Sequence, residues 1–115
     1  MQTDRELLEL AAKAAGLTAH RYCEPWKAMA QYDEVESGFF GRSWDPLTDD
    51  GDALRLAVKL NICLEFTHCE DDAPVIYCGR AEDRRYWPMS AKFPDANAAT
   101  RRAIVRAAAA IGKEM

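Results

Sequence analysis

Apolar and polar positions alternate most regularly between residues 44 and 66, in the segment WDPLTDDGDALRLAVKLNICLEF. Asp45-Pro46 is typical of a turn, because proline presets the φ angle of the first central turn position. Acidic residues follow at once and basic residues come later, as the dipole of a helix favours. The apolar positions recur near the helical period and predict a buried stripe, formed by Leu54, Ala57, Val58 and Leu60. The charged residues of this predicted helix are Asp49, Asp50, Asp52, Arg55 and Lys59.

The segment after this helix predicts an antiparallel sheet. Asn61 can take the left-handed conformation that ends a helix. Residues 62–67 alternate between apolar and polar side chains, which predicts a strand with one buried face. The residues expected on that face are Ile62, Leu64 and Phe66. Turn-forming residues separate this strand from a second at 75–79, as in a hairpin, and residues 86–89 predict a shorter third strand, which Pro88 confines to a sheet edge.

Each end of the chain predicts an alanine-rich helix. A capping box and a following glycine predict the first helix over residues 4–15. The capping residues are Thr3 and Glu6, and the glycine is Gly16. The last helix is expected from about residue 95 to Ile111, with Gly112 as its stop. Because its four alanines at 107–110 permit close approach, the two helices are expected to touch or to lie flush against the sheet.

Residues 17–43 give a weaker pattern. Residues 17–22 fit a short strand or an extended link, and residues 25–32 predict a helical turn, since proline is tolerated at the first helical position. Phe39 and Phe40, between two glycines, predict the start of a strand that runs to Trp44. The whole pattern predicts one α+β domain, residues 1–115, with three helices and a small, mostly antiparallel sheet of three to four strands in an α-β-α sandwich-like arrangement.

Composition narrows the class of protein. The chain has 115 residues, of which 49% are hydrophobic and 30% are charged, as in an ordinary globular domain. The formal charge of −4 argues against general affinity for nucleic-acid backbones. Residues 2–16 contain acids and no long apolar run, so neither a signal peptide nor a membrane span is expected. Four cysteines without a CxxC pair then favour reduced thiols in the cytoplasm.

Three segments carry a resemblance to a known family: TDRELLELAAKAAG at 3–16, WDPLTDDGDALRLAVKL at 44–60 and AATRRAIVRAAAAIG at 98–112. In the middle segment a tryptophan, a proline, a run of acids and a helix follow in fixed order. The chain resembles the phage ABA-sandwich family of small phage and prophage proteins, related to the NinX-like proteins. The resemblance implies a sandwich of helices and a sheet and a gene of phage origin, and it implies no activity and no catalytic residue.

Two groups of residues are weighed as metal sites. Four aspartates could supply oxygen ligands to a divalent cation, but their spacing does not match an EF-hand, and turn, cap and dipole roles explain them better. They are Asp45, Asp49, Asp50 and Asp52. The His/Cys group fits a tetrahedral zinc site poorly, because neighbouring residues on a strand point to opposite faces. It comprises His20, Cys23, His68 and Cys69, with Cys63 nearby. No metal and no cofactor are expected.

Basic side chains form another candidate site. Arg102 and Arg106 are four residues apart on the last helix and so share a face. With the arginines near the third strand, they are a candidate site for a phosphate or a nucleotide-like anion. Those arginines are Arg80, Arg84 and Arg85. A solvated helix face with arginines paired to carboxylates is the alternative.

Aromatic residues concentrate in the segment 17–43, among polar neighbours. They are Trp26, Tyr32, Phe39 and Phe40. Exposed aromatics would anchor a partner there, whereas buried ones would complete the core. Since no catalytic motif is present, the first hypothesis is a non-enzymatic accessory protein that binds a host or phage protein through this segment. The alternatives are an anion binder or small enzyme that uses the arginines, and a homo-oligomer that packs its alanine-rich helix on a second copy.

Overall fold

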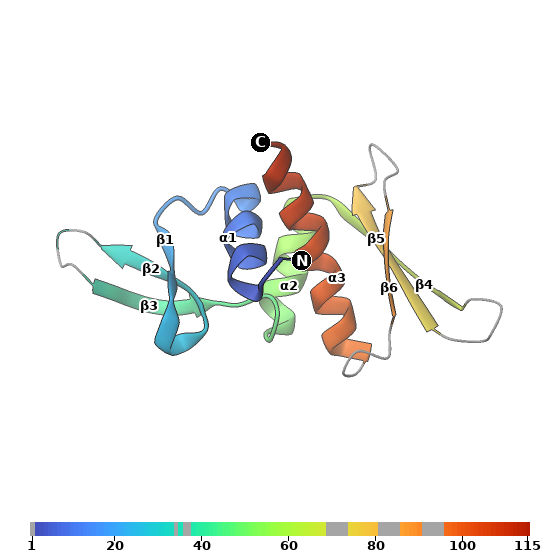
Figure 1. Ribbon diagram of the computed structural model, residues 1–115, viewed down its shortest axis with the longest axis horizontal. Helices are drawn as coiled ribbons and strands as arrows, with labels where there is room; N and C mark the ends of the chain where they lie inside the picture. The colour runs from blue at the N-terminus through green and yellow to red at the C-terminus, as the bar shows by residue number, and fades with distance from the viewer. Residues whose placement is uncertain (1, 34, 36–37, 69–73, 81–85, 91–95) are drawn as a thin grey trace.

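The computed structural model describes residues 2–33, 35, 38–68, 74–80, 86–90 and 96–115, and only the backbone of residues 33, 39–40, 67–68, 74–80 and 86–90. In this part of the chain, three helices lie between two three-stranded antiparallel sheets (Figure 1). The helices are α1 (Asp4–Ala15), α2 (Asp50–Lys59) and α3 (Ala96–Glu114). The first sheet has the order β1 (His20–Cys23), β2 (Ala28–Asp33), β3 (Gly38–Trp44). The second has the order β4 (Ile62–His68), β5 (Pro74–Arg80), β6 (Tyr86–Ser90).

α3 is the central helix of the protein. It packs along α1 and α2 and also contacts all three strands of the second sheet, while α1 contacts β1 and β2 of the first sheet. Along the longest dimension, 55 Å, the layers are therefore sheet, helices, sheet (Figure 1). The predicted α+β class, with three helices and a small antiparallel sheet, is confirmed. The structure adds a second sheet on the opposite side of the helices, so the helices lie between two sheets and the predicted α-β-α order of layers is not observed among the described elements.

The first sheet forms from the segment with the weakest sequence pattern. The predicted strand that ends at Trp44 is confirmed as β3. The predicted helical turn is wrong beyond Trp26, because a 3₁₀ turn, η1, covers Glu24–Trp26 and β2 follows. Lys27 ends the turn with a φ of 52°, in the left-handed region, and Ala28 then pairs with Cys23 across a hairpin. Pairing with β1 and β3 thus outweighs the local helical preference of this segment.

The limits of α1 follow from its caps. The Thr3 hydroxyl oxygen accepts a hydrogen bond from the Glu6 N–H at 3.2 Å, as predicted for a capping box. Gly16 has a φ of 77° and ends the helix in the left-handed conformation that favours glycine. The predicted helix over residues 4–15 is therefore confirmed at both ends.

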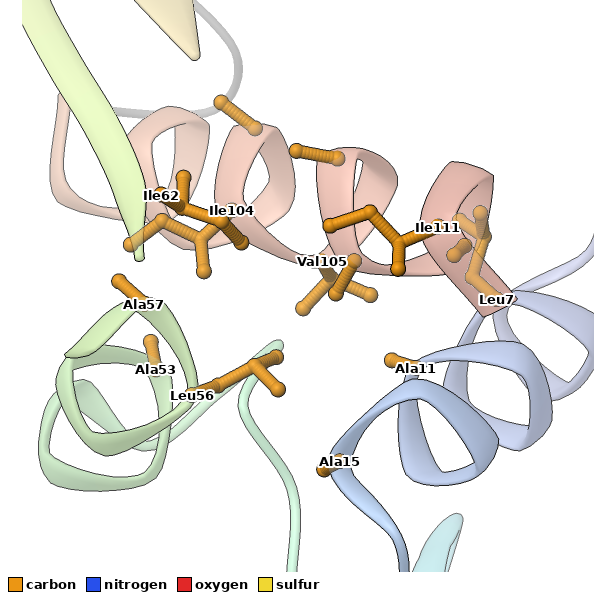
Figure 2. Close-up of a cluster of buried hydrophobic side chains, with 14 of the residues drawn as sticks. Leu7, Ala11, Ala15, Ala53, Leu56, Ala57, Ile62, Ile104, Val105 and Ile111 are labelled. Carbon is orange, nitrogen blue, oxygen red and sulfur yellow. The ribbon is translucent and has the colours of Figure 1, made fainter. Parts of the chain in front are cut away.

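The core lies where the three helices meet, and more than half of its buried side chains are alanines (Figure 2). Ala11 of α1, Leu56 of α2 and Val105 of α3 point into the same space (Figure 2). Because alanine is small, the helices must come close for the interior to fill. The expected contact between the two alanine-rich helices is confirmed, since α1 packs along α3.

Gly112 lies inside α3, which continues to Glu114, so its predicted role as a helix stop is wrong. A Cβ atom at this position would lie 2.9 Å from the Leu10 carbonyl carbon of α1 and would overlap the Leu10 carbonyl oxygen. The backbones of α1 and α3 therefore meet here at a distance that only glycine permits.

The face that α2 presents to the core matches the predicted stripe only in part, since Ala57 is buried and Leu60 packs against the core. Its buried residues include Asp52 and Leu56, which are four apart and share a face. Leu54 and Val58, from the predicted stripe, are 61% and 72% exposed. The helical period fits either face. The hydrogen bond from the Asp45 N–H to the Asp52 carboxylate favours the observed one.

The second sheet confirms the predicted hairpin and the edge position of the strand that contains Pro88. The predicted burial of β4 holds only at its start. Ile62 is 9% exposed, whereas Phe66 is 66% exposed, so the predicted burial of Phe66 is wrong. β4 runs away from the helices toward its end (Figure 1), which accounts for the loss of cover along the strand.

Gly112→Ala is expected to destabilise the protein by about 1–3 kcal/mol, because the added methyl group forces α1 and α3 apart. Gly51→Ala in α2 is the matched control. There the new Cβ would lie 3.2 Å from the flexible end of the Arg55 side chain and 3.3 Å from Asp49 Oδ2, both of them side-chain atoms. The free energy of unfolding of Gly51→Ala is therefore expected to change by less than about 1 kcal/mol. Urea denaturation measures the free energy of unfolding of both variants. An equal change in this free energy for Gly112→Ala and Gly51→Ala would contradict the close approach of the helices at Gly112.

Candidate functional site

A network of carboxylates fixes the turn before α2. Asp49 caps the helix, since its Oδ2 accepts a hydrogen bond of 2.8 Å from the Asp52 N–H. Asp52 is 6% exposed, and its two oxygens accept from the Asp45 N–H at 3.0 Å and from Arg55 Nη2 at 2.7 Å. One buried side chain therefore joins the turn, the helix and a guanidinium group. The predicted turn and capping roles of these acids are confirmed.

Arginines neutralise the outer acids of this turn. Asp50 Oδ1 lies 2.6 Å from Nη1 of Arg101 on α3. Nε of the same arginine donates to the Leu47 carbonyl at 2.9 Å, which attaches the turn to α3. Asp49 Oδ2 lies 3.6 Å from Arg42 Nη2 of β3. The turn is thus held by arginines from two neighbouring elements, α3 and β3.

Asp45 differs from these acids, because no arginine or lysine in the described part of the chain pairs with its carboxylate. Its oxygens accept hydrogen bonds from the Leu47 N–H at 3.2 Å and from the Thr48 hydroxyl at 2.7 Å. Burial raises the pKa of the Asp45 carboxyl above its usual value, these two bonds oppose the shift, and the Asp52 charge adds to it. The carboxylate is thus partly desolvated.

Trp26 is an exposed aromatic residue at the end of η1. Its side chain is 46% exposed and lies at an open recess of about 440 Å³ between η1, α1 and the turn before α2. We call this hollow the Trp26 recess. Its lining includes Asp4, Tyr22, Trp26, Lys27, Asp45 and Leu47. The recess brings an indole ring and the Asp45 carboxylate to one place on the surface, which the sequence pattern did not indicate.

The other three aromatic candidates are not placed at an exposed recess by the described part of the structure. Tyr32 is half-buried on β2, with the Arg21 guanidinium 5.7 Å from its ring centroid. The backbones of Phe39 and Phe40 pair with β2, and their side chains lie outside the described part of the structure. Of the four predicted anchors, Trp26 is therefore the one that the structure places at the surface of a recess.

Three apolar side chains that the sequence pattern assigns to the core are exposed instead. Leu54 and Val58 share a face of α2, and Phe66 lies on β4. We call these three residues the α2–β4 patch. Leu54 and Phe66 line an open recess of about 280 Å³, which Leu64 and Ile104 line as well. Periodicity marks these residues as apolar, but it does not reveal which of them the rest of the chain covers.

The arginines of α3 divide between two sides of the helix. Arg102 Nη2 lies 2.9 Å from Asp4 Oδ1 of α1, whereas Arg101 reaches the turn before α2. Arg102 and Arg106 line one hollow of about 240 Å³ together with Leu7, which confirms their shared face. The side chains of Arg80, Arg84 and Arg85 lie outside the described part, so the convergence of all five arginines stays a prediction.

His20 and Cys23 lie on β1, where Cys23 is buried. Nδ1 of His20 is buried and has no hydrogen-bond partner among the described residues. Burial lowers the pKa of His20 below its usual value. The His68 side chain and Cys69 lie outside the described part. Within the described residues, no group of three or more histidine, cysteine, aspartate or glutamate side chains could hold a metal ion.

The alanine-rich face of α3 is already covered within one chain. Ala107, Ala108 and Ala109 have no exposed surface and belong to the core. A second copy cannot reach these alanines without displacing a helix of the first. These alanines are therefore not available to a second copy, and a homo-oligomer that uses other residues of the helix stays a prediction.

Comparisons of the chain with protein-family models, curated proteins and solved structures found no match. A search of the described helices for one long and apolar enough to cross a membrane also found none. The fold and surfaces define an α+β protein in which a helical layer separates two sheets. Its function has to be inferred from the exposed surfaces themselves.

Asp52→Ala is expected to destabilise the protein by about 1–3 kcal/mol, because it leaves the Asp45 N–H without its acceptor. Glu9→Ala removes an exposed carboxylate that pairs with Arg5, and a change below about 0.5 kcal/mol is expected there. Urea denaturation measures the free energy of unfolding of both variants. A loss in Asp52→Ala no larger than that in Glu9→Ala would show that the buried network is not needed.

His20→Gln tests the buried imidazole through the pH dependence of stability. Because burial lowers the pKa of His20 in the folded protein, the unfolded chain binds more protons below about pH 6.5. The free energy of unfolding of the wild type is therefore expected to fall as the pH drops through this value, and less so for His20→Gln. If the free energy of unfolding changed with pH in the same way for the wild type and for His20→Gln between about pH 5 and 8, the lowered pKa of His20 would be contradicted.

Proposed function

We propose that the protein is a non-enzymatic accessory protein of phage or prophage origin that binds another protein through the α2–β4 patch. The observation that carries the proposal is the exposure of Leu54, Val58 and Phe66, since large apolar side chains are unfavourable in water. Single exposed apolar residues are normal, but two that line the same recess, as Leu54 and Phe66 do, are typical of a binding surface.

The size of the patch fits the centre of a contact. A phenylalanine that is 66% exposed, with a leucine and a valine of similar exposure, leaves about 300 Å² in water, comparable to the largest patches on monomers. Covering this area contributes about 7 kcal/mol before the costs of association. A stable interface buries about 800 Å² on each partner, so the patch would be the anchor and polar surroundings would complete the contact.

The recess beside the patch fits a partner's side chain better than a free small molecule. Its volume of about 280 Å³ lies just below the usual range for ligand pockets, and Leu54 and Phe66 at its rim are mostly in water. β4 also forms an edge of its sheet. An extended segment of a partner can pair with such an edge while it places an apolar side chain in the recess.

The phage origin is supported by the resemblance of the turn, of α2 and of the two terminal helices to phage and prophage proteins. A protein of this origin would work in the cytoplasm of the host cell, where host proteins and phage proteins are both available as partners. Binding alone, without a chemical step, accounts for a surface whose most prominent feature is apolar.

Leu54→Ser and Phe66→Ser are each expected to weaken partner binding about tenfold or more, because each removes an apolar anchor. Both side chains are more than half exposed, so the fold and the Tm are expected to be retained. The measurement is affinity capture from cells that carry the phage or prophage, with quantitative mass spectrometry of the captured proteins for each variant.

Val35→Ser is the matched control, since Val35 is 94% exposed and lies outside the patch. A partner captured equally by the wild type, the control and both patch variants would remove the proposed surface. Light scattering of the purified protein distinguishes a second copy from a different partner. A dimer that Phe66→Ser dissociates would replace the accessory-protein proposal with a homo-oligomer.

A further inference from the structure

We infer that the Trp26 recess receives the guanidinium group of an arginine from the bound protein, so that the partner presents a basic residue in addition to its apolar anchor. The inference rests on the proposed protein-binding function and specifies the chemistry of the partner. Three features of the recess support it: a carboxylate without a cation in the described part of the chain, an exposed indole ring, and neighbouring charges that are already paired.

Asp45 supplies the charge that the arginine would meet. The neighbouring acids Asp49, Asp50 and Asp52 lie 3.6, 2.6 and 2.7 Å from arginine nitrogens. Among the described residues, Asp45 has hydrogen bonds from its own turn and no such cation. Each carboxylate oxygen can accept a further hydrogen bond, so a guanidinium group can bind without breaking the turn. Burial makes a charged Asp45 unfavourable, and a cation at the recess offsets that penalty.

Trp26 supplies an aromatic face for the same cation. Pro25 lies in the first turn of η1, and Lys27 follows in the left-handed conformation, so the turn that displays the indole is conformationally restricted. Tryptophan is the side chain that binds cations best through its ring face. The protein already contains a contact of this kind, since the Arg5 guanidinium lies 5.1 Å from the ring centroid of Tyr22, which lines the same recess.

The other charges near the recess are paired within the chain. Lys27 Nζ lies 2.7 Å from Glu24 Oε1, and Asp4 Oδ1 lies 2.9 Å from Arg102 Nη2. Among the described residues the Asp45 carboxylate therefore has no cationic partner, and the whole chain has a formal charge of −4. Phosphate and other anions are therefore disfavoured in the recess, while a basic segment is attracted to it.

The test titrates the ¹⁵N-labelled full chain with acetyl-Gly-Arg-Gly-amide and with the same peptide containing citrulline, which has the shape of arginine without its charge. The arginine peptide is expected to shift the Trp26 indole N–H and the amide resonances of Asp45, Leu47 and Thr48 in a saturable way. The citrulline peptide is expected to produce little shift. Binding of the arginine peptide is expected to weaken as the salt concentration rises.

Trp26→Ala and Asp45→Asn are each expected to weaken binding of the arginine peptide about fivefold or more, as read from the amide resonances of Leu47 and Thr48. Asp50→Asn is the matched control, because Asp50 belongs to the same turn but already pairs with Arg101, and its affinity is expected to be unchanged. Trp26 is 46% exposed, so its replacement is expected to keep the fold. Equal shifts with the arginine and citrulline peptides, or an affinity that neither variant lowers, would overturn the inference.

Failure of this inference is distinguishable from failure of the proposed function, because the Trp26 recess and the α2–β4 patch share no residue. Leu54→Ser is expected to bind the arginine peptide like the wild type. Capture of a partner that depends on Leu54 but not on Trp26 would overturn the inference and keep the proposed function. Binding of the arginine peptide without any dependence of capture on Leu54 would remove the patch and keep the cation site.

Discussion

The buried carboxylate of Asp52 is the interaction on which both proposed surfaces depend. It accepts the Asp45 N–H while it sits in the first turn of α2, and this bond sets the rotation of the helix about its axis. With Asp52 turned inward, Leu56 enters the core and Leu54 faces water. This bond involves the Asp45 N–H and not the Asp45 carboxylate, and Asp45 lines the Trp26 recess. A single buried acid thus determines where the apolar surface and the acidic surface lie.

The packing of α3 makes this arrangement rigid. Arg101 attaches the turn before α2 to α3 through Asp50 and the Leu47 carbonyl. On its other side α3 approaches α1 so closely that Gly112 meets the Leu10 backbone. A core rich in alanine buries little apolar area per side chain, so its stability depends on such close contact. The sheets lie outside this helical layer, which leaves part of β4 without a helix to cover it.

The sequence predicts structural features that depend on neighbouring residues in the chain. It misses features that depend on contacts between separate helices, strands and turns. Caps at Thr3 and Gly16 act within one turn of chain, so the limits of α1 could be read from the residues themselves. The rotation of α2 could not, because a helical period fits two faces and a bond from Asp45 favours one of them. The role of Gly112 depends on a contact with a residue about a hundred positions away, and a glycine near a helix end otherwise resembles a stop. Exposure of Trp26 likewise follows from how η1 meets the turn before α2.

The two surfaces contribute differently to partner choice. Under the proposed function, burial of apolar side chains at the α2–β4 patch would supply affinity but would discriminate weakly among apolar partners. The Asp45 carboxylate adds discrimination, because a partner that covers the Trp26 recess without a cation would desolvate a charge that lacks compensation among the described residues. A partner with an anion there would be disfavoured further. Under the proposed function, a partner that presents both an apolar anchor and an arginine would therefore be favoured over one that presents only the apolar anchor.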